Sequence, residues 1–132
     1  MSTDYLELIK QVAQHLETII EKMDSLVFWP ITWDDSYLLL RELETAVEQI
    51  DKLNGLLETI FDDESFCDDI QNKAIVQNLD EAYSCFDSFS SHFSNIESVL
   101  REEGPRENYE EDYDYLSAQL KKAKQYLNQI LM

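Results

Sequence analysis

Apolar side chains recur at alternating intervals of four and three residues along four separate stretches of this chain. The interval matches one face of an α-helix, so each stretch predicts a helix that buries a narrow apolar stripe against neighbouring helices. The stripe richest in aromatic rings lies in residues 75–100 and consists of Ile75, Leu79, Ala82, Phe86, Phe89, Phe93, Ile96 and Leu100. We expect this helix to contribute the heaviest part of the core.

The other three stripes share this spacing. In residues 4–26 the stripe consists of Tyr5, Ile9, Val12, Leu16, Ile19, Met23 and Leu26. In residues 33–61 it consists of Leu39, Leu43, Ala46, Ile50, Leu53, Leu57 and Ile60. Near the end of the chain it consists of Tyr109, Tyr113, Leu116, Leu120, Ala123, Leu127 and Ile130. These stripes predict an all-α fold in which residues 1–132 form a single domain, an antiparallel up-down-up-down four-helix bundle with a long third helix.

Proline, glycine and capping residues predict the limits of the first two helices. Pro30 forces Trp29 out of helical geometry and should end the first helix. Thr32 is then the expected N-cap of a second helix over residues 33–61. Gly55 lies inside this second helix, and the apolar stripe stays in phase across it. We therefore expect a continuous or slightly bent helix there, with a break as the alternative.

The third helix is predicted from about residue 66 to residue 103, capped by Ser65 at its start. Its first apolar residues are out of phase with the main stripe, so a bend or reset near residues 71–73 is left open. Gly104, followed by proline, should end this helix in a left-handed conformation. Asn108 is the expected N-cap of the fourth helix, because a glutamate follows three residues later.

The charge of the chain restricts its partners. It carries 28 acidic and 10 basic residues, which gives a net charge of −18. Phosphate groups would be repelled, so we expect no direct binding to nucleic acid and none to an anionic membrane surface. A basic protein is the natural partner of such a surface. Acidity that serves only solubility is the alternative interpretation.

Several features predict a cytoplasmic location. The first residues lack a basic start followed by an apolar core, so we expect no signal peptide. No apolar run reaches the length of about 18 residues that a membrane-spanning helix needs. Cys67 and Cys85 would lie ~27 Å apart on one continuous helix and could not bond to each other. Two free thiols fit a reducing compartment.

The sequence contains little catalytic or metal-binding chemistry. Residues 62–69 hold five acids, but an EF-hand loop needs a central glycine that is missing here, so a calcium site stays a minor alternative. A di-iron bundle site needs a glutamate three residues before each histidine. Val12 precedes His15 and Phe89 precedes His92 at that spacing. We therefore expect no enzyme activity and no cofactor.

One end of the predicted bundle combines aromatic residues with carboxylates. The carboxylates would steer a basic partner, and the aromatic rings would anchor it. An alternative for the two tryptophans is that they cover the open end of the core. The predicted partner-binding residues are Trp29, Trp33, Asp34, Asp35, Glu107, Tyr109, Glu110, Glu111, Asp112, Asp114 and Tyr115.

These observations favour a non-enzymatic inhibitor or immunity-type protein that blocks a basic, nucleic-acid-handling protein. Its carboxylates would stand where phosphates lie, as in nucleic-acid mimics. The alternative is a structural or adaptor bundle that forms a homodimer or docks a partner helix. The face for that association would be a ridge of small polar residues, namely Ser84, Ser88, Ser91, Asn95 and Ser98.

Overall fold

The computed structural model describes residues 5–27 and 30–132, with residue 31 described by its backbone alone. In this part of the chain every regular element is a helix, which confirms the all-α prediction. The long helices are α1 (Leu6–Val27), α3 (Ser36–Phe61), α5 (Lys73–Arg101) and α6 (Glu110–Leu131). The short ones are α2 (Pro30–Asp34), α4 (Glu64–Asp68), η1 (Ile70–Asn72) and η2 (Arg106–Asn108).

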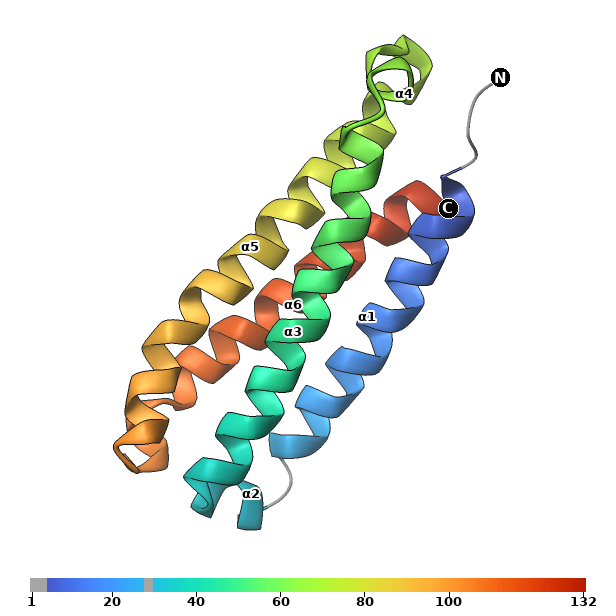
Figure 1. Ribbon diagram of the computed structural model, residues 1–132. Helices are drawn as coiled ribbons and strands as arrows, with labels where there is room; N and C mark the ends of the chain where they lie inside the picture. The colour runs from blue at the N-terminus through green and yellow to red at the C-terminus, as the bar shows by residue number, and fades with distance from the viewer. Residues whose placement is uncertain (1–4, 28–29) are drawn as a thin grey trace.

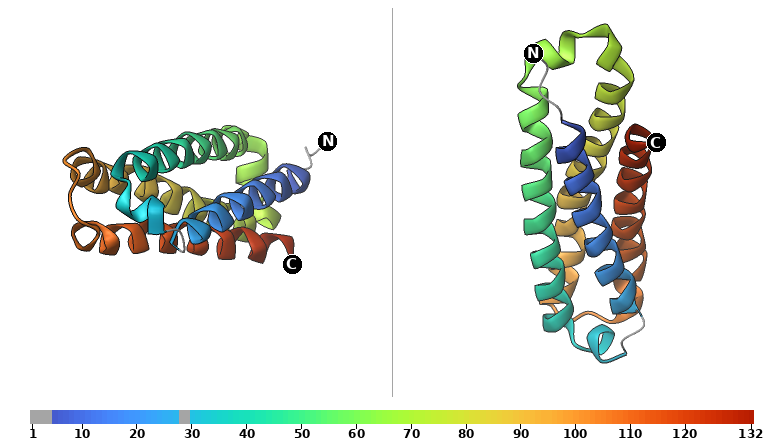
Figure 2. Two further views of the ribbon diagram at one scale, coloured as in Figure 1. Left: turned by 90° about the horizontal axis from the view of Figure 1, so that it is seen from below. Right: turned by 90° about the vertical axis from the view of Figure 1, so that its right-hand side faces the viewer.

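The long helices lie side by side, and each runs opposite to the one before it in the chain (Figure 1). Helix α5 packs against α3 and α6, while α1 packs against α6 and less extensively against α3 (Figure 2). The α1–α3 and α5–α6 connections lie at one end, and the α3–α5 connection lies at the other (Figure 1). None of the helices in residues 5–27 and 30–132 combines the length and apolar character needed to cross a membrane.

The four apolar stripes meet in one hydrophobic cluster that extends along the long helices. Every stripe residue predicted from the spacing is buried, except that Tyr5, Ile75 and Ile130, close to the ends of the helices, are partly buried. Each fully buried aliphatic or aromatic side chain contributes roughly 1.5–3 kcal/mol relative to an exposed one. The stripes therefore account for the mutual packing of the helices.

The second predicted helix is divided at Asp35. Helix α2 ends before this residue and α3 begins after it. The Asp35 backbone is extended (φ −104°, ψ 93°), and its carboxylate accepts a hydrogen bond from the Leu38 N–H at 3.1 Å. The N-cap is thus Asp35, and the prediction of Thr32 is wrong. Helix α3 continues through Gly55, as predicted.

The third predicted helix is not continuous over residues 66–103: α4 and η1 precede α5, so the structure shows the reset that was left open near residues 71–73. Asp63 accepts a hydrogen bond from the Phe66 N–H at 3.1 Å and begins α4, so the cap is not Ser65. Asp69 has extended backbone (ψ 121°) and accepts from the Gln71 N–H at 3.0 Å. These aspartates end one helical segment and begin the next, since their side chains satisfy free backbone N–H groups.

The end of α5 differs from the prediction in which residue is left-handed. Glu103 has positive φ (55°), and the described glycines do not. The Gly104 N–H donates to the Val99 carbonyl at 2.9 Å, and the Glu103 N–H donates to the Leu100 carbonyl at 3.1 Å. These two bonds form a Schellman motif with glutamate at the position that glycine usually occupies.

Helix α6 begins at Glu110, one residue later than its stripe. Tyr109 precedes it without capping it through its side chain, and Asn108 belongs to η2, so the predicted Asn108 cap is wrong. The position before α6 is occupied by a buried aromatic residue, whose contacts form part of the site described next.

Candidate functional site

A cluster of aromatic rings ties together the two connections at one end of the molecule. Trp33 stacks on Tyr109 with ring centroids 5.5 Å apart and meets the edge of Tyr113 at 5.1 Å. The Trp33 indole N–H donates to the Val27 carbonyl at 2.8 Å. The Tyr109 hydroxyl donates to the Trp33 carbonyl at 2.7 Å, and the Tyr113 hydroxyl donates to the Met23 carbonyl. The cluster therefore fixes α2 and the start of α6 to the end of α1.

Burial determines what these rings can do. Trp33 is only 5% exposed and Tyr109 is fully buried, so neither ring projects freely from the surface. Trp33 covers the end of the core, which is one of the two roles expected for the tryptophans, while Trp29 lies outside the described residues. Burial raises the pKa of both Tyr109 and Tyr113, which keeps their hydroxyl groups protonated as donors.

A groove with a volume of about 710 Å³ opens beside Trp33. One wall comes from the end of α2 and the start of α3, and the other comes from the segment that joins α5 to η2. The lining residues are Trp33, Asp34, Asp35, Ser36, Tyr37, Glu103, Gly104, Pro105 and Arg106. We call this feature the end groove. The end groove is a concave part of the surface at the end of the molecule that holds the α1–α3 and α5–α6 connections.

Among the described residues that line the end groove, Arg106 is the single basic one. Its guanidinium carbon lies 4.3 Å from the centroid of the Trp33 ring, a cation–π contact. Its Nη2 atom lies 3.4 Å from Oε1 of Glu110. The other charged lining residues are Asp34, Asp35 and Glu103, all exposed, so carboxylates outnumber cations around the groove.

The sequence identified only part of this groove. Trp33, Asp34 and Asp35 were predicted partner-binding residues, and all three line the groove. Tyr37, Glu103 and Arg106 were not among them, although all three line the groove. The basic residue was missed because a sequence pattern selected for acids and aromatic rings excludes it. Its position over an indole ring results from tertiary contacts that have no periodic signal in the chain.

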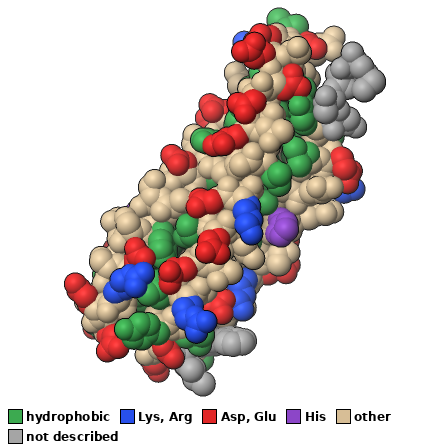
Figure 3. All heavy atoms as spheres, viewed as in Figure 1, with side chains coloured by type: hydrophobic (Ala, Val, Ile, Leu, Met, Phe, Trp, Pro, Cys, Tyr) green, Lys and Arg blue, Asp and Glu red, His purple; other side chains and the backbone are tan. Residues whose placement is uncertain are grey.

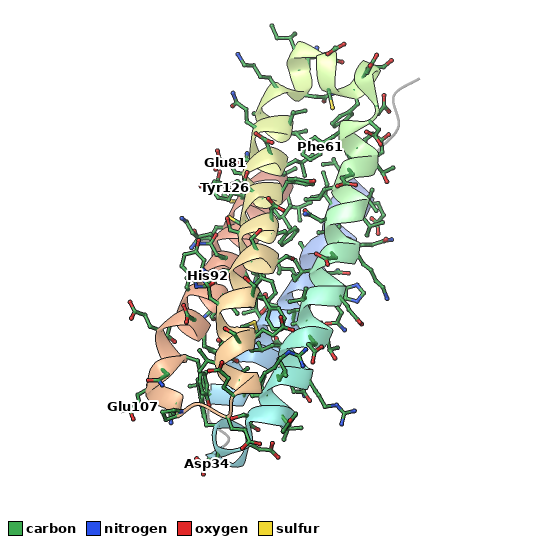
Figure 4. All side chains as sticks on the ribbon, turned by 60° about the vertical axis from the view of Figure 1, so that its left-hand side comes forward. Asp34, Phe61, Glu81, His92, Glu107 and Tyr126 are labelled. Carbon is green, nitrogen blue, oxygen red and sulfur yellow. The ribbon has the colours of Figure 1, made fainter. Side chains whose placement is uncertain are left out.

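The carboxylates of η2 and of the first turns of α6 extend the acidic surface at the same end. Glu107, Glu111 and Asp114 are exposed, while Glu110 pairs with Arg106. Asp34 and Glu107, which come from the two different connections, both lie at this end of the molecule (Figure 4). The structure thus brings together most of the predicted carboxylates, but around a groove whose floor is already filled with packed rings.

Two of the predicted partner-binding residues, Asp112 and Tyr115, do not lie at the end groove. Asp112 Oδ1 lies 2.9 Å from His92 Nε2, and the Tyr115 ring packs on the same imidazole with centroids 4.1 Å apart. His92 lies farther along the molecule than Glu107 (Figure 4). Asp112 and Tyr115 therefore join α6 to α5 on the side of the helix pair, away from the end groove.

The acidity is not confined to the end groove. Acidic side chains are spread over the whole visible face, including both ends (Figure 3). At the far end, Asp63 accepts a hydrogen bond from the Tyr5 hydroxyl at 2.7 Å, and this bond is the main cause that lowers its pKa. In residues 5–27 and 30–132, no group of three or more His, Cys, Asp or Glu side chains is arranged to hold a metal ion.

The two cysteines are free, as predicted, but for a different geometric reason. Cys67 lies on α4 and Cys85 on α5, so the two do not share one helix. Burial is the main cause that raises the pKa of each thiol, which disfavours the reactive thiolate.

Comparison of the chain with protein-family models, with curated proteins and with solved structures finds no match. The distinguishing properties of the candidate site are a concave surface, a fixed aromatic floor and a local excess of carboxylates.

Proposed function

We propose that this protein is a non-enzymatic binding module that blocks a basic, nucleic-acid-handling protein, with the end groove and the surrounding carboxylates as its docking surface. The observation that carries the proposal is the combination of Asp34, Asp35 and Glu103 on one groove. None of the three forms an ion pair with a residue that the structure describes. A basic partner would supply the missing countercharges.

The proposed mechanism is mimicry of phosphates by carboxylates. A protein that binds nucleic acid presents lysine and arginine side chains at the spacing of phosphate groups, and a surface of carboxylates can occupy them instead. A net charge of −18 would accelerate the encounter by long-range attraction. Blocking then requires no chemical step, only occupancy of the partner's nucleic-acid-binding surface.

The architecture we propose for this role is the antiparallel up-down-up-down four-helix bundle, with α5 as its long third helix. Such a bundle supplies a rigid support for the groove. The contacts of Trp33 with Tyr109 and Tyr113 support this view, because they connect the floor of the groove directly to α6. Carboxylates on a rigid support lose little conformational entropy when a partner binds.

The test is capture of basic proteins on the immobilised protein, with elution in steps of increasing salt. The changed variant carries Asp34→Asn and Glu103→Gln, which removes two charges at the groove. Its matched control carries Asp80→Asn and Glu81→Gln, which removes two exposed charges from α5. Glu81 lies far from Asp34 along the molecule (Figure 4).

We expect a basic protein that elutes at moderate salt, is lost with the groove variant and is retained with the control. The captured protein should also lose its binding to nucleic acid when the wild-type protein is added. Retention that ignores salt would contradict phosphate mimicry. Equal losses with both variants would show that the end groove has no special part in docking.

A further inference from the structure

We propose that the end groove selects arginine over lysine in the basic partner, and that Arg106 holds the guanidinium position until the partner's arginine displaces it. This inference rests on the proposed function and names the chemical group that the groove recognises. Three observations carry it: the contacts of Arg106 itself, its weak attachment, and the carboxylates that its side chain leaves unpaired.

Arg106 already shows how a guanidinium fits the groove. Its guanidinium carbon lies over the Trp33 ring, 4.3 Å from the ring centroid. Its edge reaches the Glu110 carboxylate. Stacking on an aromatic face combined with hydrogen bonding at the edge is specific to the planar guanidinium. A lysine ammonium is compact and strongly hydrated, so it gains less from the same surface.

Arg106 is held weakly enough to leave. It belongs to η2, an element of three residues, and its side chain is 48% exposed. In its ion pair with Glu110, the N–O distance is 3.4 Å and the Glu110 side chain is 49% exposed. Exposed pairs of this kind contribute little to stability. Rotation of the Arg106 side chain into solvent therefore uncovers the indole without disturbing the buried contacts of Trp33.

The groove contains carboxylates that Arg106 does not pair with, and these are available to the guanidinium of a partner's arginine. Arg106 pairs with Glu110 on α6, while Asp34, Asp35 and Glu103 line the groove without an ion pair to any residue in the described ranges. Tyr37, which is 57% exposed, adds an accessible aromatic ring to the same lining. A partner's arginine would thus find a stacking surface and several acceptors in place of one.

The experiment compares two peptides of equal charge, hexa-arginine and hexa-lysine, by titration calorimetry at low salt. The protein variants are wild type, Arg106→Ala, Arg106→Lys and the charge control Arg101→Ala. Arg101 lies at the same end of the molecule but outside the lining of the groove, and it pairs with Glu97 instead. Circular dichroism and thermal unfolding establish that every variant folds.

We expect hexa-arginine to bind the wild-type protein more tightly than hexa-lysine. Removal of Arg106 should strengthen the binding of hexa-arginine by about tenfold, because the partner no longer competes with a stacked cation. Arg106→Lys should strengthen it too, although this variant keeps the charge. Arg101→Ala should alter the binding of both peptides equally and only slightly.

Equal affinities of the two peptides, together with equal effects of Arg106→Ala and Arg101→Ala, would overturn guanidinium selection and leave docking by charge alone. Hexa-arginine binding that survives Asp34→Asn with Glu103→Gln would also overturn it, because the peptide would then bind elsewhere. Absence of binding by either peptide to any variant would contradict the proposed function itself. The failure of the inference and the failure of the function are thus distinguishable.

Discussion

At Glu103 and Gly104 the usual roles of the two residue types are exchanged. Glu103 adopts the left-handed backbone conformation that favours glycine, while the glycine beside it does not. Gly104 is required for space: a Cβ atom there would lie 2.7 Å from Val99 Cγ1 and 3.2 Å from the Val99 carbonyl oxygen. The strained glutamate also lines the end groove. Strain and charge thus occur at the same residue.

The two residues should respond oppositely to substitution. Glu103→Gly relieves a left-handed conformation that costs other residues roughly 1–2 kcal/mol, and it adds unfolded-state entropy of roughly 0.4–1 kcal/mol, so we expect a net gain between about zero and about 1.6 kcal/mol. Gly104→Ala should cost about 1–3 kcal/mol through overpacking against Val99. Urea unfolding measures both changes. A destabilising Glu103→Gly would mean that the glutamate side chain contributes more than its backbone strain costs.

The buried tyrosines predict a loss of stability in alkali. Burial raises the pKa of Tyr113 and Tyr109 in the folded protein above the unfolded value near 10. Because the folded state keeps the proton more tightly, the stabilisation is complete below about pH 10 and falls above it. We expect the free energy of unfolding to fall by up to about 1.4 kcal/mol per pH unit for each tyrosine.

Denaturant unfolding between pH 8 and pH 11 would measure this fall. Tyr113→Phe should make it shallower, because it removes one of the two buried hydroxyl groups whose pKa is raised. The same slope in wild type and Tyr113→Phe would contradict the assignment.

At the scale of the elements, the apolar stripes predicted the helices well and their limits poorly. A stripe records which residues face the core, but it does not mark where a helix begins: the stripe of α3 starts at Leu39, four residues after the cap at Asp35. The breaks depend on which aspartate side chain reaches a free N–H group. Several aspartates lie in each of the α1–α3 and α3–α5 connections, and the spacing of apolar residues does not indicate that Asp63 rather than Ser65 caps α4.

Asp35 tests this account of the helix limits, because it is both a cap and a groove carboxylate. Asp35→Ala should lower the free energy of unfolding by about 1 kcal/mol through loss of the bond to Leu38. Asp35→Asn keeps a capping oxygen and should restore most of that stability. Asp34→Ala, which removes a neighbouring exposed carboxylate, is the control and should have little effect. Urea unfolding of the three variants is the measurement.

The candidate site was partly predictable for the same reason. Its carboxylates follow from composition and from the antiparallel order of the helices, which brings the α1–α3 and α5–α6 connections to one end. The groove itself depends on the stacking of Trp33 and Tyr109 and on the cation above them. Such contacts join residues 76 positions apart. No local sequence pattern encodes these contacts. The enrichment of tryptophan at interfaces suggests that Trp33 contacts a partner, whereas the fold buries it.

For the whole molecule, salt should act on stability and on docking in opposite directions. The ion pairs among the described residues are exposed or partly exposed, such as Lys121–Asp24 at 3.2 Å and Lys22–Glu42 at 3.5 Å, so they offset little of the repulsion within a chain of net charge −18. Raising sodium chloride from about 0.1 M to about 1 M shortens the screening length from about 10 Å to about 3 Å. The midpoint of thermal unfolding should therefore rise, while the affinity for hexa-arginine should fall.

Asp80→Asn with Glu81→Gln provides the matched variant for this prediction. It should stabilise the protein at low salt, because it removes two charges from a repelling surface, and the gain should shrink at high salt. If the melting midpoint fell with sodium chloride, the net effect of the surface charges would be attractive, and the acidity would serve the fold itself. A rising melting midpoint together with a weakening affinity would instead mean two things. The surface carboxylates repel one another and destabilise the folded chain, and they attract a basic partner.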